Sequence, residues 1–428
     1  MVNPQGENMA RALDKKSGNM HIIILSVYYS LFFLLTDYGI SVNASVIALT
    51  VLLFGYFVFN IKDFLHCTLT VPIAILIISV FTVLLNIRSL DYIKNNPMYL
   101  YSMIVAAVSI IYMRYDKKSR RYIMNILLAV SILSASVAIF SRCFPQFYLD
   151  KIASGLSNES FEYAKRMIME GYSGVIGGRI SLSITYIVCG LAICLGRFFD
   201  GKKKGYLVLA LYLFIAVICT NRRSELLACI CAFVVIFYMR ANKEKKKLLL
   251  LIVCVAAVLL AILIILVAKH VITYNGDNRL IKSFFGLFNG EDISNGRIAL
   301  YRIAWQLFCS NPITGIGFGN FQRYGSQQIQ QVSNVHNIYL QLLCETGILG
   351  TIIIMSALIF LTVKLYNNFK EAKKKINFDS SYFSMYMMIF ILVLGLFDNP
   401  IFQDTFWLLL CFIITCGFYN KYEIRGVK

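Results

Sequence analysis

The residue with the clearest chemical capacity is His336, one of only four histidines in a chain of 428 residues. It lies in the segment VHNIYLQLLCETGILG (335–350), where a polar loop runs into an apolar helix. An imidazole group titrates near neutral pH, so a histidine in this position can take a proton from an attacking hydroxyl. The alternative is a structural histidine at a helix end, and the neighbouring residues decide between the two.

Arginines stand at the ends of three other apolar or amphipathic segments. Arg179 directly precedes ISLSITY, Arg222 and Arg223 lie in CTNRRSELL, and Arg297 opens RIALYRIAWQLFCS. A guanidinium group keeps its charge and presents a planar fork of donors that suits phosphate oxygens. We interpret these four residues and His336 as one shared anion site. Other basic residues of the same loops are interpreted as contacts to lipid headgroups: Arg279, Lys282, Arg302 and Arg323.

This set of side chains suits the transfer of a sugar from a diphosphate leaving group. The arginines would neutralise the diphosphate, and His336 would deprotonate the hydroxyl of the incoming acceptor. The predicted outer loops contain no DxD pair and no histidine cluster, so we expect neither a metal ion nor a cofactor.

A glycine-rich segment, NPITGIGFGNF, precedes His336. Asn311 and Pro312 end the preceding helix, and three glycines follow: Gly315, Gly317 and Gly319. Glycine permits backbone conformations and close approaches that other residues do not. Two alternatives stay open for this segment, a tight structural turn and direct contact with a ligand.

A helical wheel drawn from His336 separates the residues that follow it. Gly347 and Gly350 fall on the histidine side, where they leave room for a neighbouring helix or for a lipid tail. Glu345 falls on the opposite side, one turn below Gln341, which can donate a hydrogen bond to it. A carboxylate at this depth must be paired, so we interpret Glu345 as a supporting residue, with a catalytic role as the alternative.

The composition indicates that these segments lie in a membrane. Hydrophobic residues make up 58% of the chain and charged residues 15%, with a mean hydropathy of +0.69. We therefore predict an all-α integral membrane protein with a single polytopic domain covering residues 1–428. Apolar segments of membrane-crossing length predict about twelve spans: 22–40, 42–61, 67–86, 97–114, 122–144, 180–199, 205–220, 224–239, 248–268, 338–363, 381–397 and 402–419.

The distribution of charge sets the orientation of these spans. The formal net charge is +19, and the predicted spans place 26 of the 41 Lys and Arg residues inside and 15 outside. Basic loops stay cytoplasmic, so both termini are predicted to be cytoplasmic, and the charge needs no nucleic acid to explain it. Two large outer loops result, 145–179 and 269–337. The second is expected to contain a short amphipathic helix in the membrane interface over 297–310.

The twelve cysteines are scattered mostly within the predicted spans and form no CxxC pair. They predict neither a disulfide framework nor a zinc site.

The motif region, 297–350, resembles the superfamily of O-antigen ligases and Wzy-type polysaccharide polymerases. Its ligases share a His followed by Asn, Ser or Gln, nine residues, Gly, two residues, and then Gly, Thr or Tyr. Here His336, Asn337, Gly347 and Gly350 satisfy every position. NPITGIGFGNF is similar to the Pro- and Gly-rich segment that precedes the histidine in the family. GGRISLS and TNRRSELL are similar to its two arginine-bearing stretches.

The resemblance implies an inverting, metal-independent glycosyltransferase that uses an undecaprenyl-diphosphate-linked oligosaccharide as donor. His336 would be the base, Arg223 or Arg222 together with Arg297 would hold the diphosphate, and Arg179 would support them. Of the adjacent pair, Arg223 is favoured. A polymerase is ranked above a ligase because a composition rich in Ile, Lys, Asn, Tyr and Phe suggests a low-GC bacterium that makes a capsule.

The resemblance also implies a location and a set of partners. The expected location is the bacterial cytoplasmic (inner) membrane, which the chain crosses many times. The expected partners are membrane lipids, a flippase and a chain-length regulator, in addition to the lipid-linked donor. A transporter or flippase of lipid-linked oligosaccharide remains the alternative from another class, since twelve helices suit it.

Overall fold

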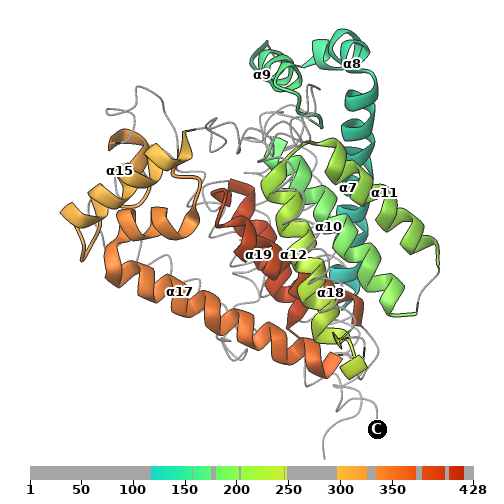
Figure 1. Cartoon of the computed structure of the whole chain (residues 1–428). Coiled ribbons are helices and arrows are strands. Elements are labelled where there is room, and N and C mark those ends of the chain that lie inside the picture. The colour runs from blue at the N-terminus through green and yellow to red at the C-terminus, as the bar shows by residue number, and fades with distance from the viewer. Residues whose placement is uncertain are drawn as a thin grey trace, which may run out of the picture.

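The computed structural model is helical throughout the residues that it describes, and these contain no strand (Figure 1). Described are residues 117–156, 158–174, 180–201, 204–244, 246–247, 296–324, 334–372, 378–400 and 404–418. The predicted spans at 22–40, 42–61, 67–86, 97–114 and 248–268 lie outside this part, as does Arg179. The all-helical class is thus confirmed, while the number of twelve spans stays a prediction.

Seven of the predicted spans coincide with helices of the structure. They are α7 (Lys117–Cys143), α10 (Ile180–Phe199), α11 (Gly205–Cys219), α12 (Arg223–Arg240), α17 (Ile338–Ala372), α18 (Phe378–Leu394) and α19 (Asp404–Gly417). In the described part, Arg120–Cys143 of α7 and the whole of α17 are long and apolar enough to cross a membrane. Shorter apolar helices are Ser183–Phe199, Gly205–Cys219 and Phe378–Leu394.

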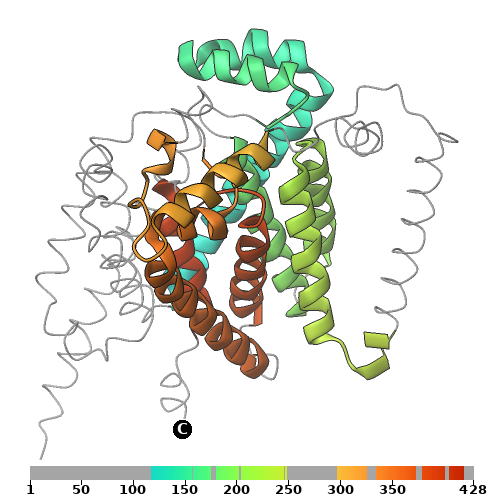
Figure 2. The same ribbon diagram turned by 60° about the vertical axis from the view of Figure 1, so that its left-hand side comes forward.

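Helix α10 lies in the middle of the bundle and packs against α7, α11 and α18, while α12 and α19 pack against α18 (Figures 1 and 2). Small residues bring these helices close together. A Cβ atom at Gly190 would collide with Ser131 of α7, and one at Gly196 would collide with the backbone of Asp379 in α18. Such contacts are typical of helices that pack in a membrane, where small residues let two backbones approach.

Three short elements follow α7 and stand beyond the end of the bundle, at the top of Figures 1 and 2. They are α8 (Pro145–Lys151), the 3-10 turn η2 (Ala153–Gly155) and α9 (Asn158–Met169). These elements fill most of the segment that was predicted as the first large outer loop. Their position at one end of the bundle is the one that this prediction requires.

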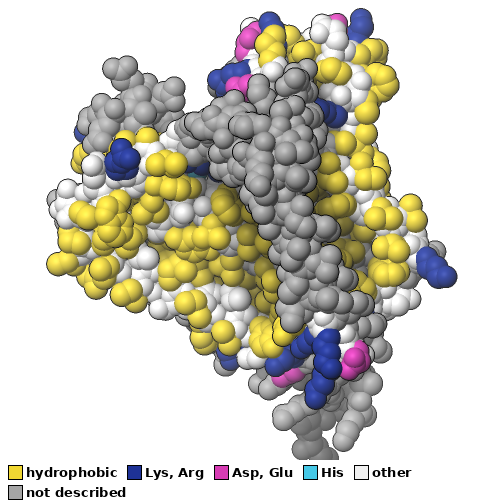
Figure 3. Space-filling view, in the orientation of Figure 1, with side chains coloured by type: hydrophobic (Ala, Val, Ile, Leu, Met, Phe, Trp, Pro, Cys, Tyr) yellow, Lys and Arg dark blue, Asp and Glu magenta, His cyan; other side chains and the backbone are white. Residues whose placement is uncertain are grey.

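The helix predicted over 297–310 is α15, Arg297–Ser310. It packs on α17 through Leu300 and Ala304, which are buried, while Ile298 and Trp305 remain exposed. Its exposed apolar side chains fit the predicted membrane interface, although the placement in the interface stays a prediction. In the view of Figure 3, most of the visible Lys and Arg side chains lie toward the upper and lower ends. Hydrophobic side chains cover much of the described surface between these ends.

Helix α17 is broken one-third of the way along its length. Gly347 has φ 64° and ψ −172°, which is not helical, so Ile338–Thr346 and Ile348–Ala372 are two helical parts. The first part positions the candidate site, and the second runs obliquely along the bundle (Figures 1 and 2). The helical wheel drawn across Gly347 therefore assumed a continuity that the chain does not have.

Candidate functional site

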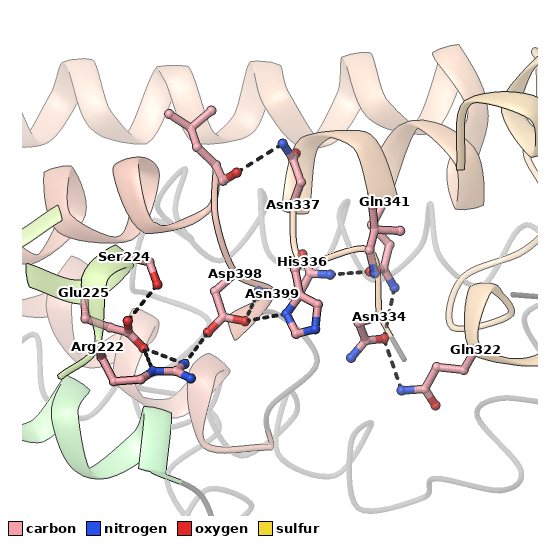
Figure 4. A network of polar contacts seen from close by, with 12 residues as sticks. Arg222, Ser224, Glu225, Gln322, Asn334, His336, Asn337, Gln341, Asp398 and Asn399 are labelled. Atoms are coloured by element: carbon pink, nitrogen blue, oxygen red, sulfur yellow. Dashed lines mark hydrogen bonds and ion pairs between the residues drawn. The ribbon is translucent and has the colours of Figure 1, made fainter. Parts of the chain in front are cut away.

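Three turns that are far apart in the sequence meet at one polar network (Figure 4). His336 precedes α17, Asp398 follows α18, and Arg222 precedes α12. All three turns were predicted to lie on the outer side of the membrane. Their meeting in space is what this predicted topology requires.

His336 faces a buried carboxylate. Its Nδ1 atom lies 3.3 Å from Oδ1 of Asp398, and the Asp398 side chain is only 13% exposed. The backbone N–H of Asn399 donates to the same oxygen at 2.8 Å. A proton on Nδ1 can be donated to Asp398, which leaves the lone pair on Nε2 and makes this atom able to act as a base.

Arg222 holds the other side of this carboxylate. Its Nη2 lies 3.2 Å from Oδ2 of Asp398 and 2.7 Å from Oε1 of Glu225, which is fully buried. Burial alone would raise the pKa of Asp398, but the hydrogen bond with His336 and the charge of Arg222 lower it to about 2. Burial alone would lower the pKa of Arg222, yet the carboxylates of Glu225 and Asp398 raise it above its usual value. Asp398 therefore stays ionised at neutral pH.

The turn that carries His336 has a strained backbone that several contacts hold in place. His336 has φ 55°, in the left-handed region that side chains other than glycine rarely enter. Asn337 caps α17, since its Oδ1 accepts the N–H of Leu340 at 3.0 Å, and its Nδ2 donates to the carbonyl of Leu396 at 3.2 Å. The N–H of Ile338 donates to the carbonyl of Gly395 at 2.8 Å. Asn337 thus joins the His336 turn to the Asp398 turn.

The turn that carries Arg222 is strained in the same way. Asn221 has φ 58°, and it and His336 are the two non-glycine residues with positive φ in the described part. The Nδ2 atom of Asn221 donates to the carbonyl of Gly171 at 2.7 Å, and the guanidinium of Arg222 lies 5.7 Å from the ring centre of Tyr172. Strain that the surroundings maintain gathers at functional sites, and here it occurs on both sides of Asp398.

Glu345 holds the glycine-rich segment. Its carboxylate accepts the backbone N–H of Gly319 at 2.8 Å and of Phe321 at 3.0 Å. Gln341 donates to it at 3.0 Å, which is the predicted contact. Glu345 is fully buried and has its hydrogen bonds within the fold. This geometry favours the supporting role for Glu345.

The glycine-rich segment packs directly on the break in α17. Gly315 has φ 69°, and a Cβ there would collide with the backbone of Glu345 and Gly347. The N–H of Gly317 donates to the carbonyl of Glu345 at 2.9 Å. Of the two alternatives left open for these glycines, the structure favours the tight structural turn. The segment carries no strand, and its N–H groups at Gly317, Gly319 and Phe321 already donate to Glu345.

The two motif glycines of α17 differ in their surroundings. A Cβ at Gly347 would collide with Ile313 and Thr314, so the glycine-rich segment occupies the space predicted for a neighbouring helix or a lipid tail. A Cβ at Gly350 would collide with the side chain of Thr346, within α17 itself. Gly347 therefore permits the break in the helix and the close contact of this break with the preceding loop.

The arginines predicted for the anion site are placed differently from one another. Arg222, and not the favoured Arg223, lies in the network, where it binds two carboxylates. Arg223 is the first residue of α12. Arg297 lies on the same face of α15 as Tyr301, one turn away, and the Tyr301 hydroxyl donates to the backbone carbonyl of His336 at 3.4 Å. This places Arg297 on the face of α15 that meets the His336 turn.

Sequence reasoning missed Asp398, the residue that contacts both His336 and Arg222. The available signal was its position: an aspartate in FDNP (397–400), a short predicted outer turn between two apolar spans. A charge in such a turn needs partners from other turns. This reasoning applies to Asp398 as well as to the arginines of CTNRRSELL.

The fold and the network together indicate a helical membrane protein in which a histidine contacts an aspartate, and this aspartate also contacts an arginine. The family model described as O-antigen ligase matches residues 208–355, a range that contains Arg222, Arg297 and His336 but not Asp398. The match supports a place in the O-antigen ligase and Wzy-type polymerase superfamily for this part of the chain, and the resemblance seen in the sequence is confirmed there. No curated protein matches the chain significantly.

The match supports, in general terms, an O-antigen ligase or polymerase type of glycosyltransferase activity. It also implies interaction with lipid-linked oligosaccharide and membrane lipids. The apolar helices agree with a membrane protein.

Proposed function

We propose that this protein is a polymerase that joins undecaprenyl-diphosphate-linked oligosaccharide repeat units into a capsular, extracellular or O-antigen polysaccharide. The reaction would take place at the outer face of the bacterial cytoplasmic membrane. The observation that carries the proposal is the chain of contacts from His336 through Asp398 to Arg222, made by three predicted outer turns. A histidine backed by a buried carboxylate is an arrangement suited to general-base catalysis.

In the proposed reaction, Nε2 of His336 takes the proton from a hydroxyl of the acceptor sugar. The hydroxyl oxygen then forms a bond to the anomeric carbon of the donor, and the bond from that carbon to the diphosphate oxygen breaks. A single displacement inverts the anomeric carbon. Asp398 stabilises the imidazolium that forms, and undecaprenyl diphosphate leaves with the bonding electrons.

The charge that develops on the leaving diphosphate would be met by arginine side chains, without a metal ion or cofactor. We assign this role to Arg223 and Arg297, with support from Arg179. We assign Arg222 to a different role, because its guanidinium already pairs with Glu225 and Asp398. A diphosphate would have to displace both carboxylates to reach it, so Arg222 positions Asp398.

The residues that support the site act on its geometry. Asn337 caps α17 and joins the His336 turn to the Asp398 turn. The glycines and Glu345 hold the segment before His336 against the break in α17. Both sets of contacts would keep Nε2 of His336 in a fixed position relative to the donor. Holding two reacting groups in a fixed orientation raises the rate of their reaction strongly.

A ligase is the second candidate, since it uses the same donor and differs only in its acceptor. A purified reaction that contains only lipid-linked repeat units separates the two. A polymerase lengthens the units into a ladder of products, which sizing on a gel detects. A ligase leaves them unchanged until a lipid or cell-wall acceptor is added.

A transporter or flippase of lipid-linked oligosaccharide is the candidate from another class. In sealed vesicles, a transporter moves labelled lipid-linked sugar across the bilayer, and the loss of His336 does not affect it. Movement without any new glycosidic bond would therefore contradict the enzyme. The location in the inner membrane with both termini cytoplasmic, and partnership with a flippase and a chain-length regulator, belong to this proposal as well.

A further inference from the structure

The side chain of Gln341 occupies the space between the two turns that carry His336 and Asp398, and it is only 1% exposed. Figure 4 shows it beside Asn334, close to both turns. A buried amide must satisfy a carbonyl and an NH₂ group at once, so its orientation is fixed by its partners.

The carbonyl oxygen of Gln341 accepts hydrogen bonds from both turns. The backbone N–H of Val335, the residue before His336, donates to Oε1 at 3.0 Å. The Nδ2 atom of Asn399, the residue after Asp398, donates to the same oxygen. One oxygen atom thus joins the chain neighbours of the histidine and of the aspartate.

The NH₂ group of Gln341 fixes the direction of that oxygen. Its Nε2 donates to Oε1 of Glu345 at 3.0 Å and lies 3.4 Å from Oδ1 of Asn334. Because the backbone N–H of Val335 can only donate, Oε1 must face Val335, and Nε2 then faces Glu345. Glu345 is in turn held by Gly319 and Phe321.

We propose that Gln341 is a positioning residue, whose amide oxygen sets the distance between His336 and Asp398 by binding the turns that carry them. The inference rests on the proposed function, because it assigns Gln341 to the base of that reaction. Gln341 acts through the contact between the imidazole and the carboxylate. Its loss would leave both residues present but would change the distance between the imidazole and the carboxylate.

Other groups near His336 make contacts that do not involve Gln341, so a variant of Gln341 leaves these contacts in place. Arg222 pairs with Asp398 from the α12 side, and the Tyr301 hydroxyl of α15 binds the His336 carbonyl. Arg297 lies on the same face of α15. Together with Asp398 and Glu345, these are charged and titratable groups that Gln341→Met itself leaves unchanged.

The test measures the rate at which diethyl pyrocarbonate modifies His336 as a function of pH, with mass spectrometry of its peptide. This reaction needs no substrate and reports when the imidazole becomes reactive. The variants are Gln341→Met, Asp398→Asn and the two combined. Gln306→Met, at an exposed position of α15, is the matched control and is expected to behave as the wild type.

We expect Asp398→Asn to move the midpoint of modification, since the contact of the imidazole with the carboxylate is lost. Gln341→Met should move it in the same direction, and the combined variant should move it no further than Asp398→Asn alone. In the proposed reaction, Gln341→Met should lower kcat about 10- to 100-fold with KM changed less than about twofold. An unchanged midpoint in folded Gln341→Met overturns the proposal, as does an unchanged midpoint in Asp398→Asn.

A second variant keeps the test decisive if Gln341→Met does not fold. Asn399→Ala removes one of the two donors to Oε1 of Gln341 and leaves the contacts of the amide with Val335 and Glu345 in place. It should move the midpoint in the same direction as Asp398→Asn, and an unchanged midpoint in folded Asn399→Ala overturns the proposal. If His336→Ala still lengthens polysaccharide, the proposed function fails, yet the modification experiment still decides the role of Gln341.

Discussion

The two ends of α18 each carry a buried aspartate near arginines, but the arginines are satisfied in different ways. At the inner end, as the predicted topology has it, Asp379 accepts the N–H of Ser380 at 2.9 Å. Nearby, the guanidinium of Arg240 lies 4.0 Å from the ring centre of Phe199 and 5.1 Å from that of Phe378. The guanidinium of Arg240 also donates to the backbone carbonyl of Phe199 at 3.2 Å, so aromatic rings and a carbonyl group contact it.

At the outer end, Arg222 contacts two carboxylates, and one of them contacts His336. The inner arrangement joins α12 to α10 and α18 through the contacts of Arg240 with Phe199 and Phe378. The outer arrangement joins a titratable imidazole to a carboxylate of lowered pKa. The difference shows that burial of an aspartate beside arginines is not by itself a sign of function. The histidine and the strained turns distinguish the two ends.

The largest effect on the rate of chain lengthening is expected from His336, which has no counterpart among the contacts described at the inner end. His336→Ala should lower the rate of chain lengthening about 1,000-fold, within the range that a general base contributes. His336→Gln, which keeps a side chain of similar length, should be equally inactive. The measurement is turnover of lipid-linked repeat units by purified protein, with the thermal unfolding midpoint as a check on folding. Residual activity above one-tenth of wild type would contradict the role of His336.

The next effect concerns the charge balance of Arg222. Arg222→Met leaves the carboxylate of Glu225 buried without its cation, which we expect to cost about 3 kcal/mol of unfolding free energy. Adding Glu225→Gln should restore most of this stability but not the activity, because Asp398 still lacks its arginine. Denaturant unfolding in detergent measures the first result and product sizing the second. Recovery of both would show that Arg222 has no role beyond its pair with Glu225.

A smaller effect is expected from the loop that supports the site. Gly315→Ala forces a Cβ against the backbone of Glu345 and requires φ 69° of an alanine, so it should destabilise the protein by about 2 kcal/mol. Gly155→Ala is the matched control, because a Cβ there has open space around it. The thermal unfolding midpoints of the two variants check this difference. Equal midpoints would mean that the loop does not pack on the break in α17.

The smallest effect is the dependence of stability on acid. The pKa of Asp398 is lowered from 3.8 to about 2, so its contribution is complete above about pH 4 and is lost as the pH falls toward 2. A shift of this size corresponds to about 2.5 kcal/mol, of which about 1 kcal/mol should be lost between pH 5 and pH 3. Unfolding of the wild type and of Asp398→Asn over this range measures it. If acid lowers the unfolding free energy of the wild type no more than that of the variant, the ion pairs of Asp398 do not stabilise the fold.

Some of the site could be predicted because its signals are local in sequence. The motif spacing identified His336 and Asn337, and the i, i+4 relation of Gln341 and Glu345 on a helix predicted their hydrogen bond. Hydrophobic periodicity gave α15 its observed bounds, Arg297–Ser310. These inferences depend only on residues within a few turns of one another.

The rest depends on contacts between distant segments. His336 and Asp398 are 62 residues apart, and no periodicity relates two turns across a bundle. The choice between Arg222 and Arg223 depends on where α12 begins, because adjacent helical residues point about 100° apart. The break at Gly347 arises from the loop that packs against it, so a wheel that assumed a regular helix could not foresee it.

The most direct test of the acid–base pair at the outer end is the pH–rate profile of Asp398→Asn, measured beside the wild type and Asp379→Asn from the inner end. If His336 is the base and Asp398 orients it, the acidic limb of the profile moves in Asp398→Asn, and the rate on the plateau falls about 100-fold. Asp379→Asn should keep the wild-type limb, whatever it does to stability. An acidic limb that stays in place in Asp398→Asn, or that moves equally in both variants, would contradict the account.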